Sequence, residues 1–380
     1  NERVLNLAQA TGPQASGLAP GETIPLALNG STTLGTQALE TAGFDRLAFA
    51  SRDAIHLENG LALGAERALP LRELKLDTAR VETAGGDAAL HADAIRFANG
   101  TGTPAPAALA GTGTLTADAR LLEFSGDTTF SGMDQAVFKG AESVRFAGSG
   151  SVPNGALKAA ADVVFHGAVI APATAAQFRI EAAGRQVSFT RNTQTPVQPL
   201  SAYGSLTVDA NDIVQDGNLW APFGQITFKA ANKLEFRDGS LTSVAATPGS
   251  LLPYGRIENG RTWVLGANGS DIEVKDLPQK TIQTEAASID MQPGAKINLA
   301  GGGDLQAYEF TVGPGGSRDI LADKNTYAIL PDYTGGFAPS DAQDTFDRAS
   351  GEAAYLSGVA GLADGVYTLL PAHYALLPGA

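Results

Sequence analysis

The chain repeats a short pattern of hydrophobic and polar positions along most of its length. In each copy an apolar residue is followed by small or polar residues, then by a second apolar pair and a Gly, Asn or Ser turn. Clear copies occupy residues 49–60, 90–100, 115–126, 138–148, 157–167, 180–189, 206–217 and 228–239. From residue 90 onward the copies start 19 to 26 residues apart. A period of this length, made of short strands and turns, predicts a solenoid.

Within the repeats, apolar and polar residues alternate with a period of two. Leu74 and Leu76, for example, are interleaved with Glu73, Lys75 and Asp77, which is the pattern of a half-buried strand. Asn-Gly and Asp-Gly pairs between the strands mark sharp corners. The predicted strands are too short for a hairpin repeat of this period, so we expect parallel coils, that is, an all-β parallel β-helix. Three Pro-rich stretches, 102–106, 195–199 and 247–253, are expected to be loops that bulge from corners.

The sequence pattern changes after residue 301, where stretches rich in glycine occur at 301–304 and 313–319. A different motif follows at 327–331, 367–371 and 374–378, in which Tyr and a short apolar strand end at Pro. Proline cannot donate a hydrogen bond to a sheet. We therefore divide the chain into coils over residues 1–301 and a small, mostly β module over 302–380, expected to cover or extend the end of the β-helix. Ser340 to Tyr355 is expected to form a short helix or a polar loop.

Composition narrows the class of protein. The 380 residues carry a formal net charge of −14, with scattered Lys and Arg, which argues against binding to nucleic acid or to an anionic membrane. Cysteine is absent, which excludes disulfides, thiolate metal sites and a Cys nucleophile. No apolar stretch approaches the roughly 18 residues of a membrane span. The first residues lack a signal peptide and a Met, so we expect the sequence to begin inside a longer protein.

Two regions resemble a known family. Residues 217–230, Gly-Asn-Leu-Trp-Ala-Pro-Phe-Gly-Gln-Ile-Thr-Phe-Lys-Ala, resemble the coil phrase of filamentous haemagglutinin-like exoproteins. Residues 302–310, 313–319 and 365–379 resemble the C-terminal region of one bacterial branch of that family. The resemblance covers roughly residues 200–380, with weaker support before them.

The resemblance implies a large secreted Gram-negative protein of the two-partner secretion class, folded as a right-handed parallel β-helix. Such proteins leave through an outer-membrane β-barrel translocator, and many are adhesins. The N-terminal domain that the translocator recognises is not in this sequence, so its recognition is assigned to no residue here.

Candidate catalytic and metal-binding residues are few. β-Helical polysaccharide lyases and glycosidases need acids that converge on one groove, and the densest acidic cluster is Asp209, Asp212 and Asp216. The sequence around these acids is more typical of strand edges and a turn than of a catalytic groove. Weak cation binding is a further alternative. The four histidines lie far apart, without the spacing of a metal site: His56, His91, His166 and His373. We assign no catalytic, cofactor-binding or metal-binding residue.

Other motifs have ordinary structural explanations. Residues 266–274 echo one copy of a calcium-binding β-roll repeat, but such a site takes its ligands from stacked coils. Asn29, Asn99 and Asn268 begin Asn-Gly-Ser/Thr sequences that allow glycosylation, although turn chemistry already explains them. Trp220 and Trp263 are expected to pack in a coil or at its corner.

The sequence favours a structural and adhesive segment of a secreted surface protein that binds a host-cell, bacterial-cell or glycan ligand. Its alternative is a β-helical carbohydrate-active enzyme. In a third hypothesis, the last 80 residues mediate processing, surface retention or protein contact.

Overall fold

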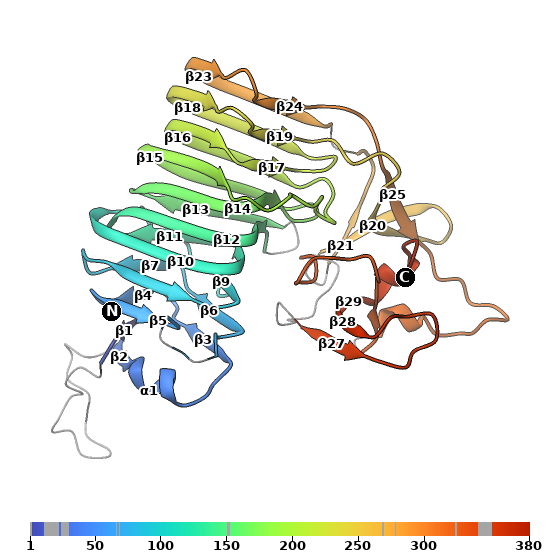
Figure 1. The fold of residues 1–380 in the computed structure, drawn as a ribbon, viewed down its shortest axis with the longest axis horizontal. Helices are drawn as coiled ribbons and strands as arrows, with labels where there is room; N and C mark the ends of the chain where they lie inside the picture. The colour runs from blue at the N-terminus through green and yellow to red at the C-terminus, as the bar shows by residue number, and fades with distance from the viewer. Residues whose placement is uncertain are drawn as a thin grey trace.

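A computed structural model describes residues 2–10, 23, 30–65, 67, 69–149, 153–267, 270–277, 279–323, 325–340 and 352–380. Within these ranges the chain is nearly all β, and 21 of its strands form one sheet that winds into stacked coils (Figure 1). All pairings between these strands are parallel. The predicted all-β parallel β-helix is therefore confirmed.

The strands stack in three rows, one for each side of the coil. The first row runs through β2 (Ser31–Gly35), β1 (Val4–Ala8), β4 (Ala54–Leu57), β7 (Arg80–Thr83), β11 (Asp127–Ser131), β13 (Asn154–Ala159) and the first halves of β15 (Gln177–Arg191), β16 (Ser205–Asp216), β18 (Gln225–Phe236) and β23 (Thr281–Met291). Each long strand bends at a coil corner, where its pairing register shifts.

The second and third rows complete the coils. The second row contains β5 (Leu61–Leu63), β8 (Ala88–His91), the first halves of β10 (Ala110–Ser125), β12 (Met133–Ala147) and β14 (Asp162–Pro172), and the second halves of β15, β16, β18 and β23. The third row contains β3 (Arg46–Ala50), β6 (Glu73–Asp77), β9 (Ala94–Ala98), the second halves of β10, β12 and β14, and then β17 (Asn218–Trp220), β19 (Leu241–Ser243) and β24 (Lys296–Asn298).

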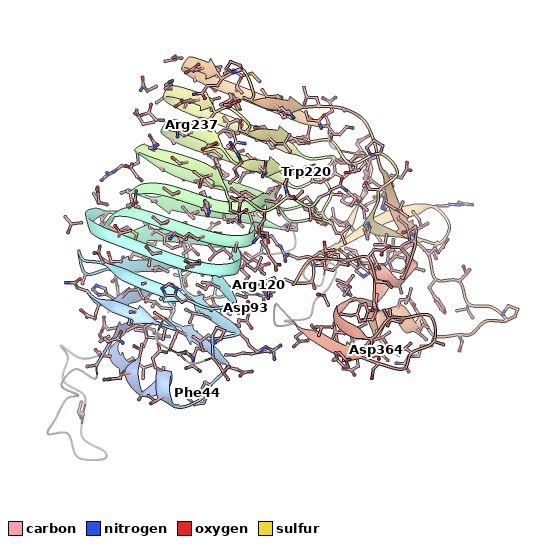
Figure 2. The ribbon with its side chains drawn as sticks, viewed as in Figure 1. Phe44, Asp93, Arg120, Trp220, Arg237 and Asp364 are labelled. Carbon is pink, nitrogen blue, oxygen red and sulfur yellow. The ribbon has the colours of Figure 1, made fainter. Side chains whose placement is uncertain are left out.

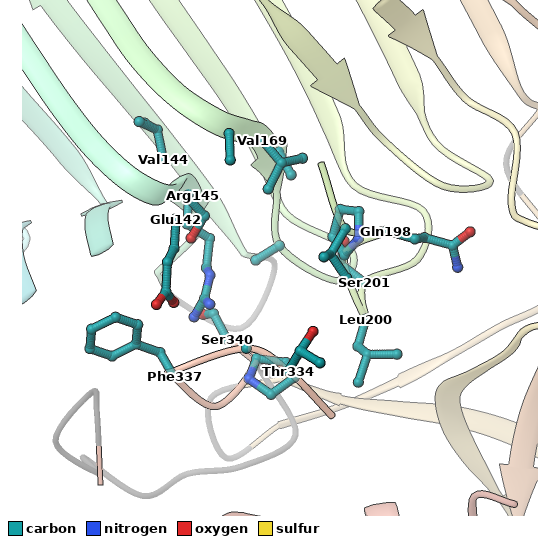
Figure 3. A pocket seen from close by; sticks show the side chains of 18 of the residues that line it. Glu142, Val144, Arg145, Val169, Gln198, Leu200, Ser201, Thr334, Phe337 and Ser340 are labelled. Carbon is teal, nitrogen blue, oxygen red and sulfur yellow. The ribbon is translucent and has the colours of Figure 1, made fainter. Parts of the chain in front are cut away.

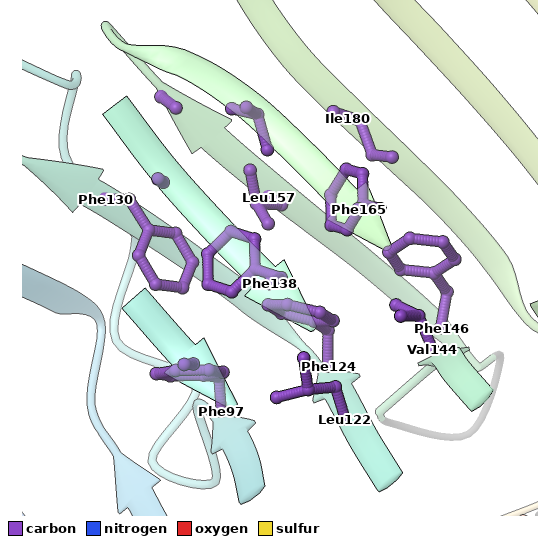
Figure 4. Close-up of a cluster of buried hydrophobic side chains, with 14 of the residues drawn as sticks. Phe97, Leu122, Phe124, Phe130, Phe138, Val144, Phe146, Leu157, Phe165 and Ile180 are labelled. Atoms are coloured by element: carbon purple, nitrogen blue, oxygen red, sulfur yellow. The ribbon is translucent and has the colours of Figure 1, made fainter. Parts of the chain in front are cut away.

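Like side chains stack on like inside the coils, as the alternating pattern requires. One ladder in the third row joins Phe97, Phe124 and Phe146, and one in the second row joins Phe138, Phe165 and Phe189. The two ladders meet at the centre, with ring centroids 4.9 Å apart between Phe124 and Phe138 (Figure 4). Continuous burial of this kind supplies most of the driving force for folding.

One buried polar residue interrupts the ladder in the second row. Gln215 takes the position between Phe189 and Phe236 and is fully buried. Its side-chain amide donates to the carbonyl oxygens of Gly217 and Leu241 and to the hydroxyl of Thr242. Because these hydrogen bonds satisfy the amide, the coil tolerates a polar group in its core.

The stack is interrupted between β19 and β23. There β20 (Leu251–Glu258), β21 (Thr262–Ala267) and β22 (Ser270–Glu273) form antiparallel hairpins, and β25 (Asp304–Tyr308) pairs with β20. This four-stranded sheet joins residues from both sides of the boundary that the sequence places at residue 301. Of the three Pro-rich stretches, 102–106 and 195–199 are loops, whereas 247–253 runs into β20.

The remaining C-terminal residues form small elements. These are η2 (Ile320–Ala322), the pair β26 (Tyr327–Ala328) and β29 (Leu370–Pro371), the hairpin β27 (Ala353–Leu356) and β28 (Gly365–Thr368), and η3 (Ala372–Leu376). They lie beside the stack rather than over the coil end formed by β23 and β24 (Figure 1). The expectation that they cover that end is therefore wrong, because their contacts are made with the flank of the stack. Most of the segment Ser340–Tyr355 lies outside the described residues.

Candidate functional site

The flank where the third row of strands faces the C-terminal module carries alternating charges. Glu73, Arg96, Glu123 and Arg145, here called the flank ladder, lie on successive coils. Arg96 Nε is 3.4 Å from a Glu73 carboxylate oxygen and 3.5 Å from one of Glu123, and Arg145 Nη1 is 3.4 Å from the other Glu123 oxygen. The period-two pattern of each strand points these side chains outward, and parallel stacking brings them together.

A segment of the module, residues 333–340, lies across this flank and is called the strap. Its Gly336 N–H donates to a Glu142 carboxylate oxygen, and Arg145 donates to the carbonyl oxygen of Ala338 at 2.8 Å. The Tyr333 hydroxyl donates to the carbonyl oxygen of Phe337 at 2.6 Å, which closes the strap on itself. The strap is therefore held to the coils by hydrogen bonds from both sides.

Phe337 anchors the strap on the coils. Its ring is only 2% exposed and packs with Ala94 and Leu121, which are both fully buried. The Arg120 guanidinium lies over the same ring, 4.9 Å from its centroid. Arg120 and Asp93 lie on the side of the stack that faces the module (Figure 2).

The pKa shifts of two residues are consistent with close contact between the strap and the coils. Partial burial lowers the pKa of Arg120, but hydrogen bonds and charges from Glu142 and Asp93 outweigh this and raise it above its ordinary value. Burial also raises the pKa of Tyr333. Both groups thus keep their proton at neutral pH, the arginine as a cation and the tyrosine as a neutral donor.

A cavity of about 230 Å³ lies between the strap, the flank and the loop at 194–201 (Figure 3). Its walls are largely apolar; the lining residues include Val144, Arg145, Val169, Leu200, Tyr333 and Phe337. Arg145, Glu142 and Tyr333 already bond to protein partners here. The cavity therefore offers apolar contact rather than a set of converging reactive groups.

The three acids suggested by the sequence do not form one groove. Asp209 lies in register between Glu181 and Lys229 in the first row. The Asp212 carboxylate accepts from the side-chain amides of Asn211 at 2.6 Å and Asn232 at 2.7 Å.

The third acid, Asp216, pairs with Arg191 at the other end of the second-row strand. Arg191 also donates to the main-chain carbonyl oxygen of Asp216. Asp212 and Asp216 thus have separate side-chain partners, and Asp209 lies in a different row of strands from both.

The histidines also remain apart, on β4, β8, β14 and η3. His166 Nδ1 is 2.9 Å from the Thr190 hydroxyl, and His373 stacks near Tyr308 and Tyr374. In the part of the chain that the structure describes, no group of three or more His, Asp or Glu side chains is placed to hold a metal ion.

The remaining sequence motifs fall in ordinary structural positions. Residues 266–274 belong to the antiparallel β21–β22 hairpin, with 268 and 269 outside the described residues. This arrangement lacks the stacked coils that a β-roll calcium site needs. Asn99 is almost fully buried, and its side-chain amide donates to the carbonyl oxygens of Thr103 and Asp127. These bonds leave it unsuited to glycosylation in the folded chain; Asn29 and Asn268 lie outside the described residues.

Trp220 ends β17 and packs at a coil corner, as predicted, whereas Trp263 lies in β21, outside the coils. Trp220 Nε1 donates to the carbonyl oxygen of Ala245 at 2.7 Å, and Trp263 Nε1 donates to that of Tyr254 at 2.8 Å. Trp263 and Tyr254 continue into an aromatic cluster with Tyr203 and Phe223 that fastens the β20–β22 hairpins to the stack. Burial, with the neighbouring Tyr203, raises the pKa of Tyr254 to about 12.

The strap contacts were not found from the sequence. Phe337 lies in a Gly- and Pro-rich stretch, and its partners Ala94 and Leu121 are about 240 and 220 residues away in the chain. The available signal was the alternating charge at outward positions of the third row, which pairs Arg with Glu on successive coils. That signal marks the flank but does not identify what binds it.

No family model, curated protein or solved structure matches this chain. The described residues contain no helix with the length and apolar character needed to span a membrane. The class of protein that the fold defines is a parallel β-helix with a docked C-terminal module.

Replacing Phe337 with alanine is expected to loosen the strap. Truncating a buried aromatic anchor removes about 3–5 kcal/mol of packing, and this loss falls on the contact between the module and the flank. Limited proteolysis should therefore cleave residues 320–340 faster, while the melting of the coils stays close to that of the wild type. The matched control is Phe44→Ala, which truncates a half-exposed ring away from the module. Unchanged cleavage of Phe337→Ala would show that the strap does not depend on this ring.

Proposed function

We propose that this chain is a structural and adhesive segment of a secreted bacterial surface protein that binds a host-cell, bacterial-cell or glycan ligand. The coils act as a rigid support, and the C-terminal module presents the binding surface. Export through an outer-membrane β-barrel translocator, guided by an N-terminal region of the longer protein, belongs to the same proposal. It is supported by the resemblance in residues 200–380.

The observation that carries the proposal is an exposed apolar pair on the β27–β28 hairpin. Tyr355 and Val366 are directly opposite each other in the antiparallel register, so their side chains lie on the same face. They are 67% and 71% exposed, and Val359 in the connecting turn is half exposed. A tyrosine and an aliphatic residue side by side in solvent form the kind of anchor that dominates binding at protein surfaces.

The enzyme alternative receives less support from the same structure. Hydrolysis or elimination on a polysaccharide requires acids that converge on the substrate. Asp209, Asp212 and Asp216 are separated by the coil geometry, and Glu142 is occupied by Arg120 and the strap.

The test is binding of the purified, labelled chain to bacterial cells, host epithelial cells and an immobilised glycan panel. Tyr355→Ala with Val366→Ala should reduce binding at least about tenfold, the loss expected when a surface anchor is truncated. The control double variant, Leu69→Ala with Leu109→Ala, removes equally exposed apolar side chains from the coil region and should bind normally. Equal binding by both double variants would refute the assigned surface. Turnover of an acidic polysaccharide, lost in Asp209→Ala or Asp212→Ala, would favour the enzyme instead.

A further inference from the structure

The coil stack has an open end at β23 and β24. Both strands pair on one side only, β23 with β18 and β24 with β19, and no described element lies beyond them (Figure 1). Ile289 and Met291 are 51% and 49% exposed, although Leu234 and Phe236, their partners one coil earlier, are buried. Ile297 and Leu299 on the same end are also exposed. Core positions and strand edges are thus presented to solvent together, which favours association.

The opposite end of the stack is covered in part. The helix α1 (Gln37–Thr41) lies across it (Figure 1), and Leu39 packs against the core. The Glu40 carboxylate accepts from the Gly64 N–H, and Arg67 donates to the carbonyl oxygens of Leu39 and Glu40. These bonds fix the helix as a cap. Among the described residues, therefore, the two ends differ: α1 stands between β2 and β3 where a second-row strand would lie, although β2 and β3 themselves pair on one side only. Head-to-tail stacking would set this helix against the second-row edge of β23, where a helix cannot continue the strand pairing.

We propose that two copies of this chain dock end to end through their β23–β24 coils, related by a twofold axis. A molecule with strand edges in all three rows at one end only can pair all three rows with a second copy only by joining like ends, and a twofold contact of this kind is closed and does not grow into a fibre. A twofold axis perpendicular to the stack reverses strand direction, so the joined edges pair as antiparallel strands. Apolar side chains of the two last coils then cover each other.

Three twofold arrangements are possible, one for each row that faces itself, and the charges of the last coil favour one of them. A twofold axis places one row of strands against the same row of the other copy and exchanges the remaining two rows. Asp290 lies in the second row and Lys296 in the third. If the second row faces the second row, Asp290 of one copy lies near Asp290 of the other. If the third row faces the third row, the two Lys296 side chains lie near each other instead. Only the contact of first row with first row brings Asp290 of each copy toward Lys296 of the other, at two equivalent places.

The first-row segment of β23 is suited to self-pairing. It runs Thr281-Ile-Gln-Thr-Glu-Ala and holds one charge, Glu285. In an antiparallel pair centred on Gln283, Glu285 is opposite Thr281 and diagonal to Gln279 and Gln283 of the other copy, so no like charges meet. The arrangement therefore joins edges without electrostatic conflict in all three rows.

The experiment measures mass by analytical ultracentrifugation across a dilution series of the full chain. The wild type is expected to sediment as a dimer, with twice the 38.9 kDa of one chain. Ile289→Asp should be monomeric at every concentration, because it places a charge in the apolar centre of the contact. Lys296→Glu should weaken association at least about tenfold, because the new carboxylate of each copy then faces Asp290 of the other copy. The matched control is Lys139→Glu, the same change at an exposed position in mid-stack, which should leave the dimer intact.

Charge exchange tests the arrangement itself. In the double variant Asp290→Lys with Lys296→Glu, the opposite charges meet again, so association should recover toward the wild-type value. Within one chain Asp290 also pairs with Lys233 at 3.2 Å, and both side chains are about half exposed. An exposed ion pair of this kind contributes little to the stability of the fold. Circular dichroism checks that each variant keeps its strands. A wild type that stays monomeric, an Ile289→Asp variant that still forms dimers, or a double variant that fails to recover would each overturn the proposal.

Discussion

Replacing Phe165 with alanine is expected to destabilise the coils by about 3–5 kcal/mol, the cost of truncating a fully buried aromatic ring. Phe165 is fully buried and lies at the meeting point of the two phenylalanine ladders. Its ring centroid is 5.3–5.9 Å from those of Phe124, Phe138, Phe146 and Phe189. The loss therefore includes ring–ring contacts on three coils, and the neighbouring backbones cannot close the cavity without breaking strand pairing.

Urea unfolding followed by circular dichroism measures this effect. Phe165→Leu should recover part of the loss, because it keeps an apolar side chain in the ladder. Tyr355→Ala truncates an aromatic ring that is mostly exposed and should change the free energy of unfolding by less than about 1 kcal/mol. In a solenoid each coil leans on its neighbours, so the central coils should lose protection from hydrogen exchange first. A Phe165→Ala variant as stable as Tyr355→Ala would mean that the two ladders do not form the core.

The sequence was sufficient to predict the coils, because alternation and stacking are local properties repeated many times. It was less reliable for register. The motif copy that starts at Leu157 follows the one at Phe138 with a short spacing of 19 residues. In the structure Phe138 pairs with Phe165 in the second row, whereas Leu157 pairs with Thr128 and Ile180 in the first row. The same sequence motif occurs on two different sides of the coil. The spacing between these two copies is short because they lie in different rows.

The hairpins β20–β22 and the position of the module could not be predicted in the same way. Pro253 suggested a loop, yet it lies in β20, where it pairs only with β25 and is next to a register shift, so that its missing N–H is tolerated. The contact of Phe337 with Ala94 and Leu121 joins distant parts of the chain once only, without a repeat to reveal it. For the acids, the local sequence around Asp212 favoured a structural position, and in the structure Asn211 and Asn232 supply amide donors to its carboxylate.

Gly64 is the position where adding a single methyl group is expected to do most damage to a coil corner. Its φ of +84° is a left-handed conformation, and an added Cβ would lie 2.0 Å from the carbonyl oxygen of His91 on the next coil. Its N–H also holds Glu40 of the α1 cap. Gly64→Ala therefore combines backbone strain with a backbone clash that no side-chain movement relieves, and we expect a loss of about 3 kcal/mol or more.

Gly60 provides the matched control for this prediction. Its φ of +79° is almost the same, but a Cβ there would meet no atom within 4 Å. Gly60→Ala should thus show the conformational strain alone, about 1–2 kcal/mol. The difference between the two variants in urea unfolding measures the close approach of neighbouring coils at the Gly64 corner. Equal destabilisation by both would mean that the coils are farther apart at that corner than the stacked arrangement requires, and the cap formed by α1 would then need another anchor.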